Sequence, residues 1–122
     1  MLVRGIRGAT VVKEDQPDQI LAATRELLEM ILHENPDIDS ADISSVIFTV
    51  TDDLNSVYPA KAARELGWVQ VPLLCAKEIP VPGSLERCIR VLLHWNTNVS
   101  QAAVRHVYLR EAQMLRPDLA ND

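Results

Sequence analysis

Apolar and polar positions follow two different periods along the chain, and the change from one to the other separates the predicted strands from the predicted helices. Residues 2–12 form a β-rich run that is interrupted by Gly5 and Gly8. Glycine inside such a run indicates a bulge or a close approach by another backbone or a ligand. We therefore expect a first strand that lacks side chains at two positions.

A helical period replaces this pattern in the next segment. Apolar or small side chains recur three and four positions apart, which predicts a helix with one buried face. The members of this stripe are Ile20, Thr24, Leu27, Leu28, Ile31 and Leu32. Pro17 suits the first turn, Asp15 or Gln16 is the expected cap, and Asn35-Pro36 ends the helix.

The middle of the chain predicts short elements joined by turns. Residues 45–50 are typical of a buried strand, and Pro59 opens a short helix over 59–66. An extended segment follows over 69–75. Because Pro72 has no amide hydrogen to donate, this segment is expected to be an edge strand or to be interrupted there.

The last third mixes clear and conflicting signals. Residues 80–84 form a rigid loop, and 85–95 predict a strand that places Cys88, Arg90, Leu92 and His94 on one face. Over 101–115, Ala102-Ala103 favours a helix, whereas the alternation over 104–109 favours a strand. With no repeat and no linker, the chain is predicted to be one α/β domain over residues 1–122, with a mixed α+β sheet.

Two arginines stand alone within apolar or small runs, Arg7 in the first strand and Arg90 in the last long one. A guanidinium held against a core is costly unless a partner neutralises it, and arginine does not escape that cost by losing its proton. The partner is either a carboxylate of the same chain or an anionic ligand. Two such sites in one small chain favour a pocket for an acidic metabolite.

Composition narrows the class of protein. The 122 residues are 48% hydrophobic and 24% charged, which is typical of an ordinary globular domain. The net charge of −5 makes nucleic acid and anionic membrane poor partners. The start of the chain has no apolar region of the kind that a secretion signal needs, and we expect a cytoplasmic protein. Two cysteines, Cys75 and Cys88, are too few for a disulfide framework.

Familiar catalytic motifs are missing. Gly5 and Gly8 are too weak a pattern for a phosphate loop, and the scattered histidines and cysteines lack metal-ligand spacing. Cys75 has no base partner in the sequence and is most simply a small buried apolar residue. We therefore expect no cofactor and no metal.

What remains is a set of cationic and polar side chains with one carboxylate after an apolar strand: Arg7, Lys61, Arg64, Arg90, Tyr108, Arg116 and Glu78. Each of these also has an ordinary structural explanation, such as a solvated helix face for Lys61 and Arg64.

Five motifs nevertheless resemble, in the same order and over essentially the whole chain, the single-domain α/β chorismate mutases. They are Arg4-Gly5-Ile6-Arg7-Gly8-Ala9-Thr10, the helix 58–66, Val71-Pro72 to Cys75 with Glu78, Cys88-Ile89-Arg90-Val91, and 105–109 with 115–119. This resemblance implies a trimeric pseudo-α/β-barrel with one domain per chain. It implies a homotrimer whose sites lie at subunit interfaces, and it favours a strand over 104–110.

The resemblance also implies roles for the site residues. Arg7, Arg64, Tyr108 and Arg116 would hold the two carboxylates of chorismate, with Lys61 at the rim. Arg90 would reach a carboxylate and the ether oxygen, while Glu78 and Cys75 would contact the ring hydroxyl. The walls would be Tyr58, Ala60, Leu73, Leu74 and Leu115. Tyr58 stands where the family commonly has phenylalanine, and Leu74 occupies a position that can be polar.

The implied activity is the conversion of chorismate to prephenate, which leads to phenylalanine and tyrosine. This pericyclic rearrangement uses no nucleophile, general base, metal or cofactor, so its chemistry would depend on Arg90, Glu78 and Arg7. Two alternatives stay open. One is an enzyme like the trimeric imine/enamine deaminases, and the other is a non-catalytic regulator that binds acidic metabolites.

Overall fold

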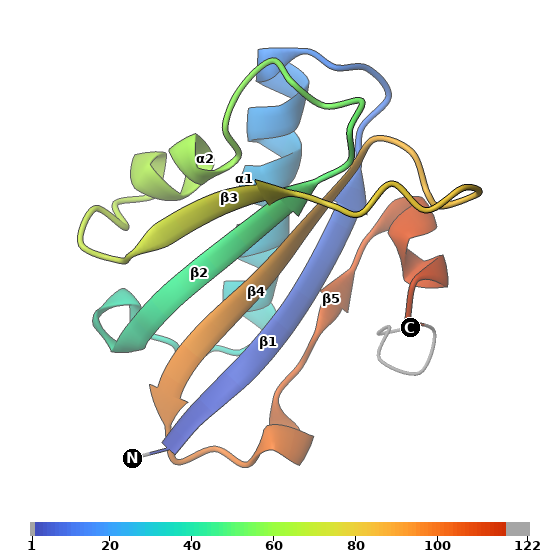
Figure 1. Ribbon diagram of the computed structural model, residues 1–122. Helices are drawn as coiled ribbons and strands as arrows, with labels where there is room; N and C mark the ends of the chain where they lie inside the picture. Colours follow the sequence, from blue (N-terminus) through green and yellow to red (C-terminus); the bar gives the residue numbers. More distant parts are fainter. Residues whose placement is uncertain (1, 117–122) are drawn as a thin grey trace.

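The computed structural model describes residues 2–116 and shows one mixed sheet with helices packed on one of its faces (Figure 1). The five strands lie in the order β3-β2-β4-β1-β5. Their bounds are β1 Leu2–Val11, β2 Ile43–Val50, β3 Leu73–Lys77, β4 Cys88–Thr97 and β5 Val107–Tyr108. The helices are α1 Pro17–Glu34 and α2 Ala60–Glu65, with short 3-10 turns η1 Ser40–Asp42, η2 Gln101–Ala103 and η3 Arg110–Met114. β4 pairs antiparallel with β1 and β2, whereas the outer pairs β2–β3 and β1–β5 are parallel.

The central strand β4 has one covered face and one open face. Val91, Leu93 and Trp95 are buried in the core cluster that also contains the α1 side chains Leu27 and Ile31. The alternate side chains of β4, beginning with Cys88 and Arg90, point away from the helices because successive strand residues face opposite sides. The predicted common face of Cys88, Arg90, Leu92 and His94 is therefore confirmed. We call this side of the sheet the open face.

Gly8 is a point of close approach in the first strand, although side chains approach it and not the backbone or ligand that was expected. The register of β1 on β4 runs without a shift from Leu2 to Val11, so no bulge accounts for the glycines. A Cβ at Gly8 would instead lie 3.0 Å from Val91 Cγ1, 3.1 Å from Ile31 Cδ1 and 3.2 Å from Leu27 Cδ1. Glycine at this position lets α1 pack directly on the sheet.

A Gly8→Ala substitution is expected to lower the free energy of unfolding by about 1–3 kcal/mol, because overpacking forces core side chains off their preferred rotamers. The urea midpoint of unfolding measures this effect. Gly5→Ala is the matched control in the same strand, since its Cβ would meet only Leu92 Cδ1 at 3.7 Å. Equal midpoints for the two variants would contradict the packing argument.

One prediction for this part of the chain is confirmed and two need correction. The segment 69–75 is an edge strand interrupted at Pro72, as predicted: β3 lies at one end of the strand order and starts at Leu73. The Pro72 carbonyl still accepts a hydrogen bond from the Val46 amide at 2.9 Å. The strand predicted over 85–95 begins at Cys88, because Arg87 adopts a left-handed φ of 47° that interrupts extended backbone. Over 104–110 only Val107–Tyr108 is a strand, and η2 and η3 flank it. The conflicting helix and strand signals there were both partly right.

Asp15 has a different role from the predicted helix cap. Gln16 occupies the cap position of α1 without a side-chain hydrogen bond. The Asp15 carboxylate accepts hydrogen bonds from the backbone amides of Asn55 and Ser56 at 3.0 and 3.1 Å. Lys77 Nζ donates to the Leu54 carbonyl at 2.7 Å and to Asn55 Oδ1 at 2.5 Å. These two residues hold the turn that leads into α2.

Asp15→Asn is expected to destabilise the fold in a pH-dependent way. Hydrogen bonds from the Ser56 side chain and from the Asn55 and Ser56 amides lower the pKa of the Asp15 carboxyl. A lowered pKa contributes stability above the unfolded-state value of about 3.9, and that contribution is lost as pH falls through the folded-state pKa. The melting temperatures of wild type and variant should therefore differ at pH 7, and the difference should shrink as pH falls below the unfolded-state value. Asp37→Asn, at an exposed loop carboxylate, should show no such gap.

Candidate active site

Arg90 and Glu78 form the charged centre of the open face. Arg90 lies on β4 opposite Thr49 of β2 and Ala9 of β1. Glu78 follows β3 directly, where its amide donates to the Val50 carbonyl at 2.9 Å. Arg90 Nε lies 3.5 Å from Glu78 Oε2, and both side chains are about one-third exposed or less, at 30% and 27%.

This contact pairs the two charges without using up the donors of Arg90. At 3.5 Å it is an ion pair but not a good hydrogen bond, and Arg90 Nε is buried with no hydrogen-bond partner in the described chain. Of the two partners that the sequence allowed for Arg90, a carboxylate of the same chain or an anionic ligand, the carboxylate is thus present. Because that carboxylate engages the guanidinium through a single long contact, Arg90 keeps capacity for an anionic ligand.

Arg7 brings a second guanidinium to the same face. It lies on β1 opposite Leu92, two residues along the strand from Ala9, which pairs with Arg90. Within residues 2–116 no carboxylate forms an ion pair with it. Its backbone amide donates to His106 Nδ1 at 2.9 Å, so that ring nitrogen carries no proton and β1 is tied to the segment before β5. Two arginines and one carboxylate therefore share the open face.

An apolar cluster adjoins these charges. Tyr108 pairs with Ala9 across β5 and β1, and both are buried together with Cys88 and Ala112, with Leu115 packed against them. Burial raises the pKa of the Cys88 thiol, and the nearby charge of Arg90 opposes that rise. Leu74 also faces this side, because it lies opposite Ile47 in the β2–β3 register. Arg116 is the last described residue and is half-buried.

The other predicted site residues lie elsewhere on the chain. Tyr58 is 71% exposed just before α2, and Ala60 is buried at the start of that helix. Lys61 and Arg64 are both exposed on α2, and their spacing of three residues places them on the same side of the helix. Leu73 and Cys75 point from the edge strand toward the covered face, where both pack against the core. A cavity of about 490 Å³ is bordered by Tyr58 and Cys75.

Within one chain these two groups of residues do not converge. Arg64 belongs to the helix layer, whereas Arg90 faces away from it across the sheet. Glu78 contacts Thr49 on the open face, while Cys75 lies beside Phe48 on the covered face. The residues expected to touch one substrate are therefore split into two half-sites.

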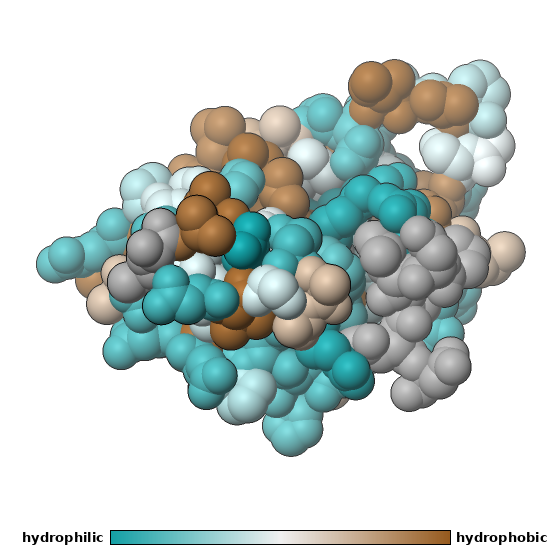
Figure 2. Space-filling view, turned by 90° about the horizontal axis from the view of Figure 1, so that it is seen from below, coloured by the Kyte–Doolittle hydropathy of each residue, from teal (hydrophilic) through white to brown (hydrophobic). Residues whose placement is uncertain are grey.

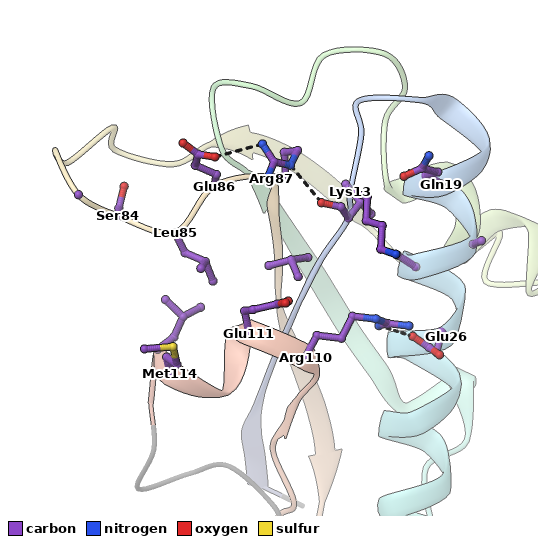
Figure 3. A pocket seen from close by; sticks show the side chains of 16 residues that line it. Lys13, Gln19, Glu26, Ser84, Leu85, Glu86, Arg87, Arg110, Glu111 and Met114 are labelled. Carbon is purple, nitrogen blue, oxygen red and sulfur yellow. Dashed lines mark hydrogen bonds and ion pairs between the residues drawn. The ribbon is translucent and has the colours of Figure 1, made fainter.

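A larger cavity of about 1140 Å³ lies between α1, the 83–87 loop and η3 (Figure 3). Of the predicted site residues, only Leu115 lines it. Two of its arginines already have acidic partners: Arg110 Nη1 lies 2.7 Å from Glu26 Oε1, and Arg87 Nη1 lies 3.1 Å from Glu86 Oε2. These two arginines are thus paired more closely than Arg90 is with Glu78 on the open face.

Exposed apolar side chains accompany the open face. Leu74 and Leu92 are exposed there, and the loop between β3 and β4 projects from the sheet with Ile79 and Val81 exposed (Figure 1). Figure 2 shows that apolar surface gathers toward one side of the molecule and on a projecting arm, while the opposite side is mainly hydrophilic. Such surface is typical of a protein–protein contact.

Thr49 is the site residue that the sequence analysis missed. Its Oγ1 donates to Glu78 Oε2 at 2.5 Å, yet a threonine inside a buried strand carries no signal of function. Only the alternation of β2, which places position 49 on the same face as its register partner Arg90, could have indicated it.

Within residues 2–116, no helix has the length and apolarity needed to cross a membrane. No three histidine, cysteine, aspartate or glutamate side chains come together as a possible metal site in the same range.

Comparison with known proteins gives concordant matches. A family model described as chorismate mutase type I matches residues 3–119. The chain is 59% identical over 118 residues to "Chorismate mutase AroH" of Thermus thermophilus, covering 97% of each chain. It is 47% identical over 121 residues to "Chorismate mutase AroH" of Bacillus subtilis (strain 168), covering 98% of this chain and 94% of that one. A solved chorismate mutase from Clostridium thermocellum superposes with a TM-score of 0.87 at 47% identity, over 90% of this chain and 97% of that chain.

Proposed function

The chain belongs to the chorismate mutase type I family and acts as a chorismate mutase, and from this premise we propose how its residues carry the reaction. The activity is an isomerisation in aromatic amino acid biosynthesis, with chorismate as substrate and prephenate as product. The observation that carries the proposed mechanism is the group of Arg7, Arg90 and Glu78 on one open sheet face.

The reaction breaks the ether C–O bond and forms one C–C bond within the same molecule. No atom is transferred to the protein, so the protein acts by holding a compact conformer and by stabilising developing charge. Arg7, Tyr108 and Arg116 hold substrate carboxylates in this proposal. Arg90 places positive charge at the ether oxygen, which gains electron density as its bond to carbon breaks.

Glu78 complements the other end of the substrate. The ring fragment becomes electron-poor as the ether oxygen becomes electron-rich, and a carboxylate beside the ring suits that polarity. The same carboxylate accepts a hydrogen bond from the ring hydroxyl. The partial burial of Glu78 and Arg90, whose side chains are less than one-third exposed, supports this assignment, because charges act more strongly where water is partly excluded.

The proposed active form is a cytoplasmic homotrimer with sites at the subunit interfaces. Arg7, Arg90, Glu78, Tyr108, Leu115 and Arg116 come from one chain. Tyr58, Ala60, Lys61, Arg64, Leu73 and Cys75 come from its neighbour, and Leu74 lies where the two meet. The separation of the half-sites by the sheet supports this arrangement, as does the exposed apolar surface beside the open face.

A chorismate-depletion assay on the purified protein, followed by absorbance with identification of prephenate, tests the activity. Depletion with a stoichiometric yield of prephenate is the expected result. Binding of chorismate without turnover would identify a regulator of the non-catalytic kind. Turnover of an imine or enamine substrate in place of chorismate would identify the deaminase-like alternative.

Cys75→Ala is expected to keep most of the activity, with a loss of no more than about tenfold in kcat/KM. A pericyclic step has no use for a thiolate, so Cys75 contributes only shape and a weak hydrogen bond to the pocket. Steady-state kinetics of the variant measure the loss. A covalent adduct on Cys75 during turnover, detected by mass spectrometry, would contradict this role.

A further inference from the structure

The Thr49 hydroxyl has an acceptor that the reaction also needs. Thr49 Oγ1 donates to Glu78 Oε2 at 2.5 Å, and this carboxylate oxygen also lies 3.5 Å from Arg90 Nε. Within residues 2–116, Glu78 Oε1 accepts no hydrogen bond and contacts no cation. One carboxylate oxygen is thus held by the protein and the other is available.

Without the hydrogen bond from Thr49, the Arg90–Glu78 ion pair would prefer a different geometry. A carboxylate beside a partly buried guanidinium tends to form two short parallel N–H···O bonds, and that arrangement occupies both carboxylate oxygens and two arginine donors. In this chain only one contact of 3.5 Å joins the two groups. The short bond from Thr49 directs Oε2 toward β2 and away from closer pairing with Arg90.

The position of Thr49 is fixed by the sheet. It lies directly opposite Arg90 in the antiparallel β2–β4 register, and the Glu78 amide is anchored to the neighbouring Val50 carbonyl at 2.9 Å. Hydroxyl, carboxylate and guanidinium therefore come from three adjacent strands or their ends. Such support from regular elements defines a geometry more closely than a loop does.

We propose that Thr49 is a positioning residue of the reaction, which holds Glu78 so that neither Glu78 nor Arg90 is consumed by their mutual ion pair. This inference rests on the proposed roles of Arg90 and Glu78. It adds a function for a residue that does not itself touch the substrate. Thr49 acts through Glu78, so its effect should depend on that carboxylate being present.

The test is a double-mutant cycle on the full-length protein. Thr49→Val keeps the side-chain shape and removes the hydroxyl, and it is expected to lower kcat about tenfold, the scale of a lost hydrogen bond to a charged group, with little change in KM. Thr49→Ser restores the hydroxyl and should recover most of that rate. In a Glu78→Ala background, Thr49→Val should cause no further loss.

Thr24→Val is the control for loss of a threonine hydroxyl away from Glu78, because Thr24 is fully buried and donates to the Ile20 carbonyl within α1. Its kcat should match that of wild type. A structural role for Thr49 would instead lower the melting temperature while leaving kcat per folded enzyme unchanged.

The possible outcomes distinguish a wrong role for Thr49 from a wrong role for Glu78. If Glu78→Ala is impaired but Thr49→Val has wild-type kcat, the role of Thr49 is wrong and the proposed function stands. If Thr49→Val lowers kcat equally with and without Glu78, its effect does not pass through Glu78 and the inference is overturned. If Glu78→Ala has wild-type activity, the proposed role of Glu78 fails and the inference fails with it.

Discussion

Replacing Arg90 with alanine should lower kcat by at least about 100-fold. The proposed interaction is made with the ether oxygen as its bond to carbon breaks, so its loss raises the barrier of the chemical step. Deleting a donor to a developing oxyanion typically costs about 3 kcal/mol, which corresponds to that factor in rate. Stopped or continuous absorbance assays at saturating chorismate measure it. KM should change much less than kcat.

Two further measurements distinguish this role from a structural one. Arg90→Lys keeps the charge but presents a compact ammonium on a different stem, so it should recover only part of the rate. If Arg90 served only to neutralise Glu78 within the fold, Arg90→Ala would lower the melting temperature and leave the folded enzyme active. A folded, trimeric Arg90→Ala variant with kcat reduced less than about tenfold would rule out the proposed role.

Mixing two inactive variants should restore activity if each site takes one half from each of two chains. Arg90→Ala disables the open-face half, and Arg64→Ala disables the α2 half. In a randomly assembled ring with head-to-tail contacts, about one quarter of the interfaces join two intact halves. Co-refolding equal amounts of the two variants should therefore recover about one quarter of wild-type kcat/KM.

The control uses two variants that damage the same half. Arg90→Ala mixed with Arg7→Ala leaves no interface with an intact open-face half, so no recovery is expected beyond the activities of the separate variants. Recovery in both mixtures would show that the variants rescue folding rather than complete a site. No recovery in the first mixture, with mixed trimers verified by mass spectrometry, would place each site within one chain.

The elements with strong periodicity were predictable from the sequence. The apolar stripe of α1 and the buried run of β2 were found within one or two residues of their bounds. The shared face of Cys88 and Arg90 followed from strand alternation alone. At Gly8 the predicted close approach is present, but the approaching groups are side chains of α1 and β4 and not the backbone or ligand that was expected.

The failures have local physical causes. β4 starts at Cys88 because Arg87 adopts a left-handed conformation that is uncommon for any residue with a Cβ, and the sequence pattern carries no sign of it. The same conformation at Arg110, with φ of 53°, ends the β5 segment and allows η3 to form. Tertiary contacts impose these conformations against local preference.

For the candidate site, the structure bears on the arrangement of the residues, while their roles stay predictions. Solitary arginines in apolar runs pointed to Arg7 and Arg90, and the family resemblance supplied the other candidate residues. Neither line of reasoning indicated that Cys75 and Glu78, three positions apart, face opposite sides of the sheet. Thr49 was missed because hydroxyl side chains are common in strands, and only a neighbour in space gives this one a role.

The two edges of the sheet bear on how the chain behaves at high concentration. β3 has five residues, follows Pro72 and ends in Lys77, and β5 has only two residues. Short edges with proline and lysine are poor templates for adding another strand, which is the step that begins amyloid-like stacking. Unwanted self-association along the backbone is thereby suppressed, so any specific contact between copies has to be made by side-chain surfaces.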